Sequence, residues 1–284
     1  MCSWHTAASD SKWGRKMPSP RPILFAAVYS LWKREILRFV RDRNRLLGSI
    51  LQPLLLWVLV GFGFGGSFTA VDVGEGPTYL EYIYPGTMML ILLFTAIFST
   101  ISVVEDKREG FMQSVIVAPI RSSGIVMGKI LGGTTVAVGE GLVFLVLAPL
   151  VGIWISPVSF VATLGTLILI AISMTGLGFK IAWRMESTAG FHAIMNLLLM
   201  PMWLLSGAFF PLSGAPQWLA WIMRVNPMTY ATAALRQVLY YPDPTVVSDD
   251  LPGLAACLAI TAVFGLAMLI WCSRAVSDRD RGSR

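Results

Sequence analysis

The sequence predicts an all-α membrane protein with six transmembrane helices. Hydrophobic residues make up 55% of the 284 residues and charged residues only 13%, and the mean hydropathy is +0.68. Such a composition leaves too little polar surface to cover a water-soluble domain. The apolar residues fall into long stretches, each near the roughly 20 residues that cross the hydrocarbon core as a helix. Basic residues gather beside alternate ends of these stretches, which is typical of multi-pass membrane proteins.

Six stretches are expected to span the membrane, because each is long and almost continuously apolar. They are residues 46–66, 83–104, 125–154, 158–182, 189–210 and 251–272. Ser156 and Pro157 predict a tight turn between the third and fourth spans. Gly128 and Gly132, four residues apart in the third span, predict a close approach of another helix. Residues 46–272 therefore form the predicted transmembrane domain.

Two polar tails and an amphipathic helix flank this domain. Residues 1–22 lack the apolar core of a signal peptide and are expected to be a cytoplasmic tail, as are residues 273–284. Within residues 23–45, one face of the predicted helix is apolar and the other is basic. The apolar face holds Phe25, Val28, Trp32, Ile36, Phe39 and Val40, and the basic face Lys33, Arg34, Arg38 and Arg41. This pattern predicts a helix in the membrane interface with its cations toward lipid phosphates. It either only anchors the chain or also contacts a cytoplasmic partner.

Positive charge is distributed unevenly between the two sides of the membrane. If the spans alternate in direction, one side carries ten cations before the first span, from Lys12 to Arg45, and most of the others. The opposite loops keep only Arg224 and Arg236, beside the acidic residues Asp72, Glu75, Glu81, Asp243, Asp249 and Asp250. The positive-inside rule then predicts that both termini, and the segment between the second and third spans, lie in the cytoplasm. The same distribution explains the net charge of +6 and predicts no nucleic-acid partner.

No catalytic residue and no metal site is predicted. His192 and Ser206 lie on one predicted helix, 14 positions apart, or about 21 Å along the axis, which excludes a catalytic pair. Met195, Met200 and Met202 are soft ligands of the kind that bind Cu(I), and together with His192 they allow a copper-site interpretation. Methionines in an apolar helix are, however, more typical of packing. A metal-handling membrane protein stays as an alternative on this observation.

Glu140 is the one carboxylate plainly inside a predicted span. Two interpretations stay open: a hydrogen bond to a neighbouring helix, or a place on a transport path. Gly124, Gly128 and Lys129 do not make a nucleotide-binding P-loop, because one residue is missing from G-x-x-x-x-G-K. We therefore expect no cofactor on this chain, and any ATP and Mg²⁺ on a partner ATPase. Free thiols are expected at Cys2, Cys257 and Cys272.

Residues 105–124 form a charged cytoplasmic segment between the second and third spans. Five consecutive charges run from Glu105 to Glu109, and a short apolar helix is expected between Gly110 and Pro119. One interpretation is an ordinary interfacial connector. The other is a docking surface joined to two spans, so that moving the segment moves both helices.

Residues 211–240 follow the fifth span and contain three prolines that prevent one continuous helix. Their tryptophans are too apolar for a free loop, so two short helices are expected at or dipping into the outer interface. Asn226 and Pro227 predict the N-cap and first position of a helix that ends near Leu239. Arg236 lies near the C-terminal end of that helix, where a cation is favourable.

Two stretches resemble signatures of the ABC-2 type transporter permeases. The first is similar to R-E-x-G-T-x-E-x-L-x-V-x-P followed by G-K-I/L through Arg108, Glu109, Gly110, Val117, Pro119, Gly128, Lys129 and Ile130, although Glu109 and Gly110 are adjacent where the pattern has one residue between them. Phe111 and Gln113 stand where the family has Thr and Glu. The second signature, S-G-x-F-F-P…W-L…N-P-x-T-Y…A-L-R, matches between Ser206 and Arg236. The resemblance is nearest to permeases of daunorubicin-type drug exporters and multidrug exporters.

The resemblance implies an exporter subunit in the lipid bilayer of a bacterial plasma (inner) membrane, paired with a second copy of itself or with a close paralogue. It implies that a separate ATP-binding-cassette ATPase drives this pair. It implies that the ATPase couples to the chain through Glu105, Asp106, Arg108, Glu109, Gly110, Phe111, Pro119 and Lys129. It further implies an outer gate, or hairpin lid, at Ser206, Gly207, Phe210, Pro211, Trp218, Asn226, Pro227, Tyr230 and Arg236. Drug-like or lipid cargo is expected from the apolar path. Lipid-linked glycans, and a membrane scaffold without transport, are the alternatives.

Overall fold

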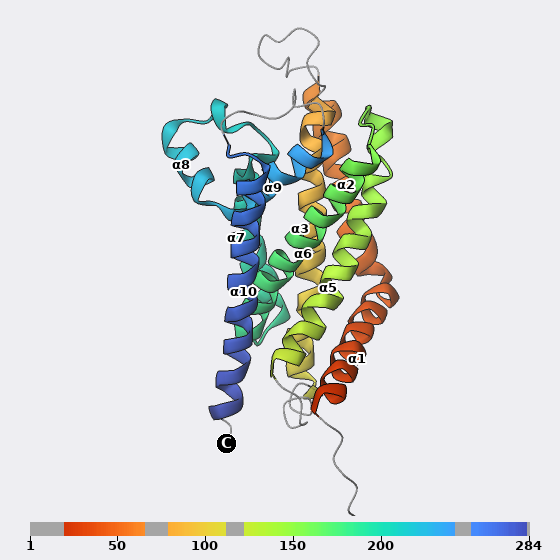
Figure 1. The fold of residues 1–284 in the computed structure, drawn as a ribbon, viewed down its shortest axis with the longest axis vertical. Helices are drawn as coiled ribbons and strands as arrows, with labels where there is room; N and C mark the ends of the chain where they lie inside the picture. Colours follow the sequence, from red (N-terminus) through yellow and green to blue (C-terminus); the bar gives the residue numbers. More distant parts are fainter. Residues whose placement is uncertain (1–19, 66–78, 112–121, 242–250, 283–284) are drawn as a thin grey trace, which may run out of the picture.

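The computed structural model describes residues 20–65, 79–111, 122–241 and 251–282 (Figure 1). Every regular element in these ranges is helical, which confirms the predicted fold class. The helices are α1 (Pro20–Arg41), α2 (Arg43–Gly65), α3 (Tyr79–Arg108), α5 (Ser122–Leu145), α6 (Pro157–Arg184), α7 (Thr188–Trp203), α8 (Gln217–Val225), α9 (Pro227–Leu239) and α10 (Leu254–Gly282). Short turns η1 (Ala148–Val151), η2 (Leu204–Ala208) and η3 (Leu212–Gly214) lie between them. Among the described residues, six helices are long and apolar enough to cross a membrane: α2, α3, α5, α6, α7 with η2, and α10.

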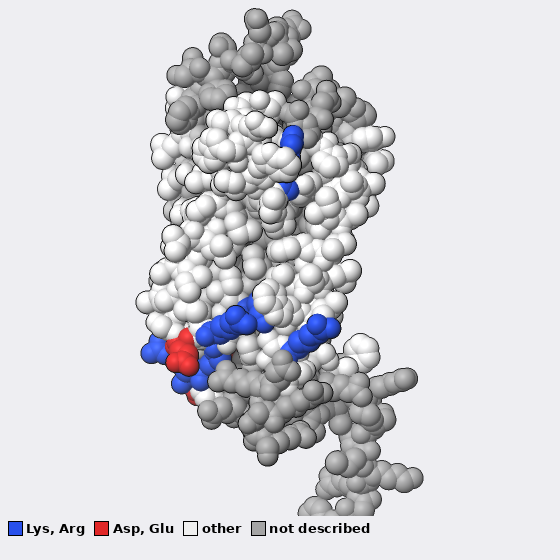
Figure 2. Space-filling view, turned by 90° about the vertical axis from the view of Figure 1, so that its left-hand side faces the viewer, with Lys and Arg blue, Asp and Glu red and all other residues white. Residues whose placement is uncertain are grey.

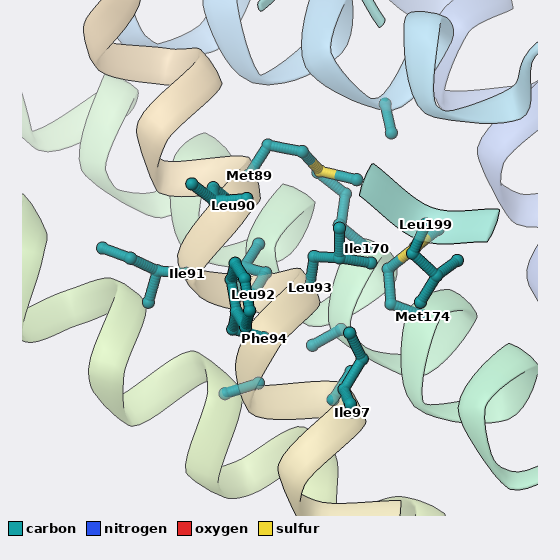
Figure 3. Packing of buried hydrophobic residues seen from close by; sticks show 14 of the residues in the cluster. Met89, Leu90, Ile91, Leu92, Leu93, Phe94, Ile97, Ile170, Met174 and Leu199 are labelled. Atoms are coloured by element: carbon teal, nitrogen blue, oxygen red, sulfur yellow. The ribbon is translucent and has the colours of Figure 1, made fainter. Parts of the chain in front are cut away.

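Helix α3 is the centre of the bundle. It packs against α2, α5, α6 and α7, and 89% of its most apolar window is buried inside the protein, against 22% for the corresponding windows of α2, α7 and α10. Figure 3 shows side chains of α3 from Met89 to Ile97 packed against Ile170 and Met174 of α6 and Leu199 of α7. The outer helices therefore leave apolar surface for lipid or for another chain, and α3 leaves almost none.

Helix α1 packs along the first half of α5 (Figure 1). Gly128 and Gly132 make this approach close, as predicted, because a Cβ at these positions would lie 2.7 Å from the Cβ of Leu31 and 2.6 Å from the Cβ of Glu35. The placement of α1 in the membrane interface stays a prediction.

Several boundaries differ from the prediction. The predicted amphipathic helix 23–45 ends earlier, because α1 stops at Arg41 and α2 begins at Arg43. Helix α5 ends at Leu145 and not at Trp154, because η1 begins at Ala148, just before Pro149, and the chain then turns at Gly152 with φ +82°. Ser156 and Pro157 cap and open α6, so the predicted tight turn is a longer link. Helix α10 continues to Gly282 and includes most of the predicted C-terminal tail.

The charged segment 105–124 also differs from the prediction. Residues 105–108 are the last turn of α3, and residues 122–124 open α5. The prediction of a loop from Glu105 was wrong, since the helix continues to Arg108. The carboxylates of Glu105 and Asp106 form ion pairs with cations of neighbouring helices, as described below. Pro119 and the predicted short helix lie outside the described residues.

The outer segment begins with a distorted turn and ends with a capped helix. In η2, Gly207 has φ +78°, a conformation open to glycine. The Asn226 side chain accepts a hydrogen bond of 3.0 Å from the Met228 N–H, and Pro227 is the first residue of α9, which ends at Leu239. The predicted N-cap is confirmed. Whether α8 and α9 re-enter the membrane stays a prediction.

We expect Gly86→Ala to destabilise the fold. A Cβ at Gly86 would lie 2.6 Å from the Cβ and 2.8 Å from the Cα of Ala208, so α3 and η2 must separate, at a cost of about 1–3 kcal/mol. The midpoint of thermal unfolding in detergent should fall. Gly139→Ala is the matched control, since no atom lies within 4 Å of a Cβ there. Equal midpoints for the two variants would contradict this packing.

Candidate functional site

A buried carboxylate at the end of α3 is the centre of the candidate site. Asp106 is 0% exposed and accepts four hydrogen bonds. Arg34 of α1 binds it with both terminal nitrogens, at 2.8 and 2.6 Å, and Arg38 donates a third bond at 2.8 Å. The fourth comes from the Lys129 ammonium of α5, at 2.6 Å. Such two-pronged arginine bonds are directional, so Asp106 fixes the position of α1 relative to α3 and α5.

Lys129 is itself buried, at 4% exposure, and joins a second carboxylate to the site. It donates to Glu35 of α1 at 2.7 Å, and the Ser102 hydroxyl donates to the other oxygen of Glu35 at 2.6 Å. Each buried charge thus has an opposite charge within hydrogen-bond distance, which offsets part of its desolvation cost.

Glu105 extends the network to α2. Its carboxylate accepts one hydrogen bond from Arg38, at 2.9 Å, and a further one from Arg45. Arg45 also forms an ion pair with Asp42 at 2.9 Å. We call the set Arg34, Glu35, Arg38, Arg45, Glu105, Asp106 and Lys129 the ion network. It connects α1, α2, α3 and α5.

The ion network corrects one expectation from the sequence. Arg34 and Arg38 were expected to point toward lipid phosphates, but both bind carboxylates of α3. The carboxylates are fixed in α3, so the four hydrogen bonds that Arg34 and Arg38 donate to them hold α1 onto the bundle. The hydrogen bonds that the Arg34 guanidinium donates to Asp106 also raise the pKa of Arg34 above its ordinary value.

Gly110 and Phe111 close the end of α3. The Gly110 N–H bonds to the Lys107 carbonyl at 3.3 Å, with Gly110 in the left-handed region at φ +77°. The Phe111 ring then lies 3.8 Å beneath the Arg34 guanidinium. Arg108 and Glu109 are exposed at this end. The predicted coupling residues divide accordingly: Asp106 and Lys129 lie inside the ion network, and Arg108 and Glu109 face outward.

Lys107, which the sequence did not single out, connects α3 to α6. Its ammonium donates to the carbonyls of Ala182 at 3.0 Å and Trp183 at 2.9 Å, and also to that of Met185. These carbonyls end α6, where a cation is favourable. The last turn of α3 thus holds α1, α2 and α5 through carboxylates and α6 through a lysine.

A second polar cluster lies at the opposite end of the bundle. Arg236 is 4% exposed, donates to the Gly207 carbonyl at 3.0 Å, and lies 4.4 Å from the centre of the Tyr82 ring. Tyr82 donates to the same carbonyl at 3.2 Å. Asn226 donates to the carbonyls of Met202 at 2.6 Å and Leu205 at 3.2 Å. These bonds take up carbonyl groups that the distorted turn leaves outside a regular helix.

The remaining predicted gate residues differ in exposure. Ser206 is buried and accepts from Thr232 at 3.2 Å, and Tyr230 donates to the Arg224 carbonyl at 2.7 Å. Trp218 is 65% exposed on α8. Phe210 and Pro211 are half-buried between η2 and η3. The structure thus brings Ser206, Gly207, Asn226 and Arg236 around one turn, and leaves Trp218 facing outward.

Glu140 lies between three helices. Its carboxyl group contacts the Ser49 hydroxyl of α2 at 2.7 Å and the Thr95 hydroxyl of α3, and it is 5% exposed. A role on a transport path stays a prediction. His192 packs against Phe98 of α3, with ring centroids 6.0 Å apart. Among the residues described here, no group of three His, Cys, Asp or Glu could hold a metal ion.

The sequence pattern of the ABC-2 type transporter family matches residues 26–240, which include both polar clusters. The chain belongs to the ABC-2 transporter family. The putative transport permease ycf38 of Cyanophora paradoxa is 26% identical over 211 residues, which cover 74% of this chain and 72% of that protein. The inner membrane transport permease YadH of Escherichia coli K12 is 24% identical over 268 residues, 92% of this chain and 98% of YadH. The probable multidrug ABC transporter permease YbhR of the same strain is 26% identical over 196 residues, 66% of this chain and 51% of YbhR.

This ABC-2 family member is therefore a membrane transport permease, and its relatives are transport components rather than enzymes. The family match confirms the resemblance seen in the two signatures. The two polar clusters therefore lie at opposite ends of a bundle whose apolar helices cross the membrane.

We expect Asp106→Asn to destabilise the permease by about 3 kcal/mol, because it leaves Arg34 and the buried Lys129 without their shared carboxylate. The midpoint of thermal unfolding in detergent should fall. Glu109→Gln removes the same charge from a side chain that is 63% exposed and lies 3.8 Å from Arg38, so it should cost under about 0.5 kcal/mol. If both variants unfolded at the temperature of the unchanged protein, the ion network would not hold the fold together.

Proposed function

We propose that the chain is the membrane subunit of an ATP-driven exporter, worked by a separate ATPase that binds at the ion-network end. The observation that supports this most is the arrangement around the last turn of α3. One short turn is joined to α1, α2 and α5 by ion pairs and to α6 by Lys107. A force applied there reaches five helices at once.

The exposed groups beside the ion network suit a protein partner. Arg108 and Glu109 face outward at the end of α3, and Arg34, which is partly exposed, stacks on Phe111. An ATPase that contacts this end would press on groups that are rigidly bonded to the bundle. Binding and movement are thereby connected without a catalytic residue on this chain.

The outer apolar faces support pairing with a second copy. Leu197, on α7, is 78% exposed, and Phe62, on α2, is 72% exposed. An apolar groove of about 630 Å³ lies between α7 and α8 and is lined by Leu197, Pro201, Trp221 and Val225, among others. Two copies facing each other would enclose such grooves at their interface. A hydrophobic or amphiphilic substrate, drug-like or lipid, fits walls of this kind.

The proposal places the ion network in the cytoplasm, and cysteine labelling tests this. In a background where Cys2, Cys257 and Cys272 are serine, Glu109→Cys should react with a membrane-impermeant maleimide in inside-out vesicles and not in intact spheroplasts. Trp218→Cys, exposed at the other end, should show the reverse. If Glu109→Cys were labelled from outside the cell, the proposed orientation would be wrong.

The purified permease should hydrolyse no ATP. Phosphate release should appear only when the cognate ATPase subunit is added, and the rate should rise with a transported compound. Lipid-linked glycans, drugs and lipids tested side by side in this assay would identify the cargo. If the permease alone hydrolysed ATP, and still did so after a second purification step, the proposal of a separate ATPase subunit would be wrong.

A further inference from the structure

Glu140, on α5, is a buried carboxyl group in the apolar middle of the bundle. It lies eleven positions along α5 from Lys129, and its partner Thr95 lies eleven positions along α3 from Asp106. Both helices therefore place it about 16 Å from the ion network, inside the candidate spans Ser123–Leu145 and Tyr79–Arg108. On the face shown in Figure 2, a band of uncharged side chains separates the basic side chains of the two ends. An ionised carboxylate at this depth is costly.

The cations of the two helices nearest to Glu140 are taken up by other carboxylates. Arg45 of α2 pairs with Glu105, and Lys129 of α5 pairs with Asp106 at 2.6 Å. The Glu140 carboxyl group itself contacts hydroxyl groups and, within the described part of the chain, forms no ion pair. Its charge would therefore stand without a counter-ion.

The helices around Glu140 carry no titratable residue near its level. None occurs in residues 46–65 of α2, 85–104 of α3 or 157–179 of α6. The titratable groups of the surrounding helices lie toward the helix ends. They are Arg41 and Asp42 after α1, Arg43 of α2, Glu81 and Tyr84 of α3, Lys180 and Arg184 of α6, His192 of α7, and Cys257 and Cys272 of α10.

The hydrogen atoms available around Glu140 favour a neutral carboxyl group. Ser49 Oγ lies 2.7 Å from one carboxyl oxygen and 3.0 Å from the Leu46 carbonyl oxygen. Thr95 Oγ1 contacts the other carboxyl oxygen and lies 2.8 Å from the Ile91 carbonyl oxygen. Each hydroxyl group has one hydrogen atom to donate, so an ionised Glu140 leaves two hydrogen atoms for four contacts. A proton on Glu140 supplies a third, because the carboxyl O–H then donates to one hydroxyl, which donates on to its helix carbonyl.

Ser49 lies at a weak point of α2. Pro53, four positions later, has no N–H to donate to the Ser49 carbonyl, so one hydrogen bond of the helix is missing there. Gly48 precedes Ser49, and no atom lies within 4 Å of a Cβ at that position. The contact with Glu140 thus joins the part of α2 that is least restrained to α3 and α5 at the centre of the bundle.

We propose that Glu140 is a proton-binding site that holds α2 against α3 and α5. With the proton bound, the neutral carboxyl group bridges the hydroxyls of Ser49 and Thr95. When α2 moves away, the carboxyl group meets water and releases the proton to it, which leaves a carboxylate. Proton binding and the seating of α2 therefore favour each other, since such linkage is reciprocal.

Infrared spectroscopy of the purified full-length permease tests whether Glu140 is neutral. Exposed glutamates are ionised at neutral pH, so a C=O stretch of a neutral carboxyl group should be present there and should disappear in Glu140→Gln. Glu186→Gln removes an exposed acid and should leave the band in place. Absence of the band, or its survival in Glu140→Gln, would overturn the proposal. Should Glu140→Gln fail to fold, the band must still shift in Thr95→Val and in Ser49→Ala, and an unmoved band in both would be equally decisive.

Stability should depend on pH through this group. The folded protein holds a proton that the unfolded chain loses above about pH 5, so raising the pH disfavours the folded state. Relative to Glu140→Gln, whose amide cannot ionise, the folding equilibrium constant of the unchanged protein should fall by up to about tenfold per pH unit. Chemical unfolding in detergent between pH 6 and pH 8 measures this difference. The same pH dependence in both proteins would contradict a bound proton.

Hydrogen–deuterium exchange tests the connection with α2. At pH 8, peptides covering residues 46–57 should exchange several-fold faster in the unchanged protein than in Glu140→Gln, and at pH 6 the two proteins should agree. Peptides of α10 are the internal control and should exchange alike in both proteins. If α2 also exchanged alike at both pH values, the proton would not hold this helix. These measurements use no ATPase, so a failed orientation or ATPase experiment leaves their outcome unaffected.

Discussion

A carboxylate that is wholly buried at the end of a membrane-spanning helix has to be surrounded by cations, and this constraint organises one end of the permease. Asp106 draws Arg34 and Arg38 from α1 and Lys129 from α5. Glu105, its neighbour, draws Arg45 from α2. Burying charges costs more than their attraction returns unless the geometry is favourable. The network is therefore better explained by the relative positions it imposes on four helices than by the stability it adds.

The sequence predicts the six spans well because apolar length is a local property and the bilayer requires it. It also predicts the cap at Asn226, since that signal needs only two adjacent residues. The partners of Arg34 and Arg38 could not be predicted in the same way, because Asp106 lies about 70 positions away in the chain. A basic face looks the same whether lipid or protein covers it.

One signal in the sequence did bear on the ion network. Leu31, Glu35 and Phe39 follow one another at four-residue steps, and all three are buried. A carboxylate in line with an apolar stripe requires a cation on the surface that the stripe covers. The ends of α5 at Leu145 and of α3 at Arg108 likewise depend on local turns and on contacts with distant residues. Helix α5 ends where the 3-10 turn at Pro149 follows, and α3 continues because Glu105 and Asp106 are neutralised by distant residues.

The two polar ends of the molecule are joined by one helix. Near its start, α3 contacts the second polar cluster. The Gly86 carbonyl accepts a hydrogen bond of 2.8 Å from the Trp203 indole N–H, and Tyr82 and Arg236 both donate to the Gly207 carbonyl. Near its end, α3 carries Asp106 and Lys107. Its 30 residues form a rod of about 45 Å, packed on nearly all sides. The outer turn at Gly207 and the ion network around Asp106 are therefore positioned by contacts with one and the same helix.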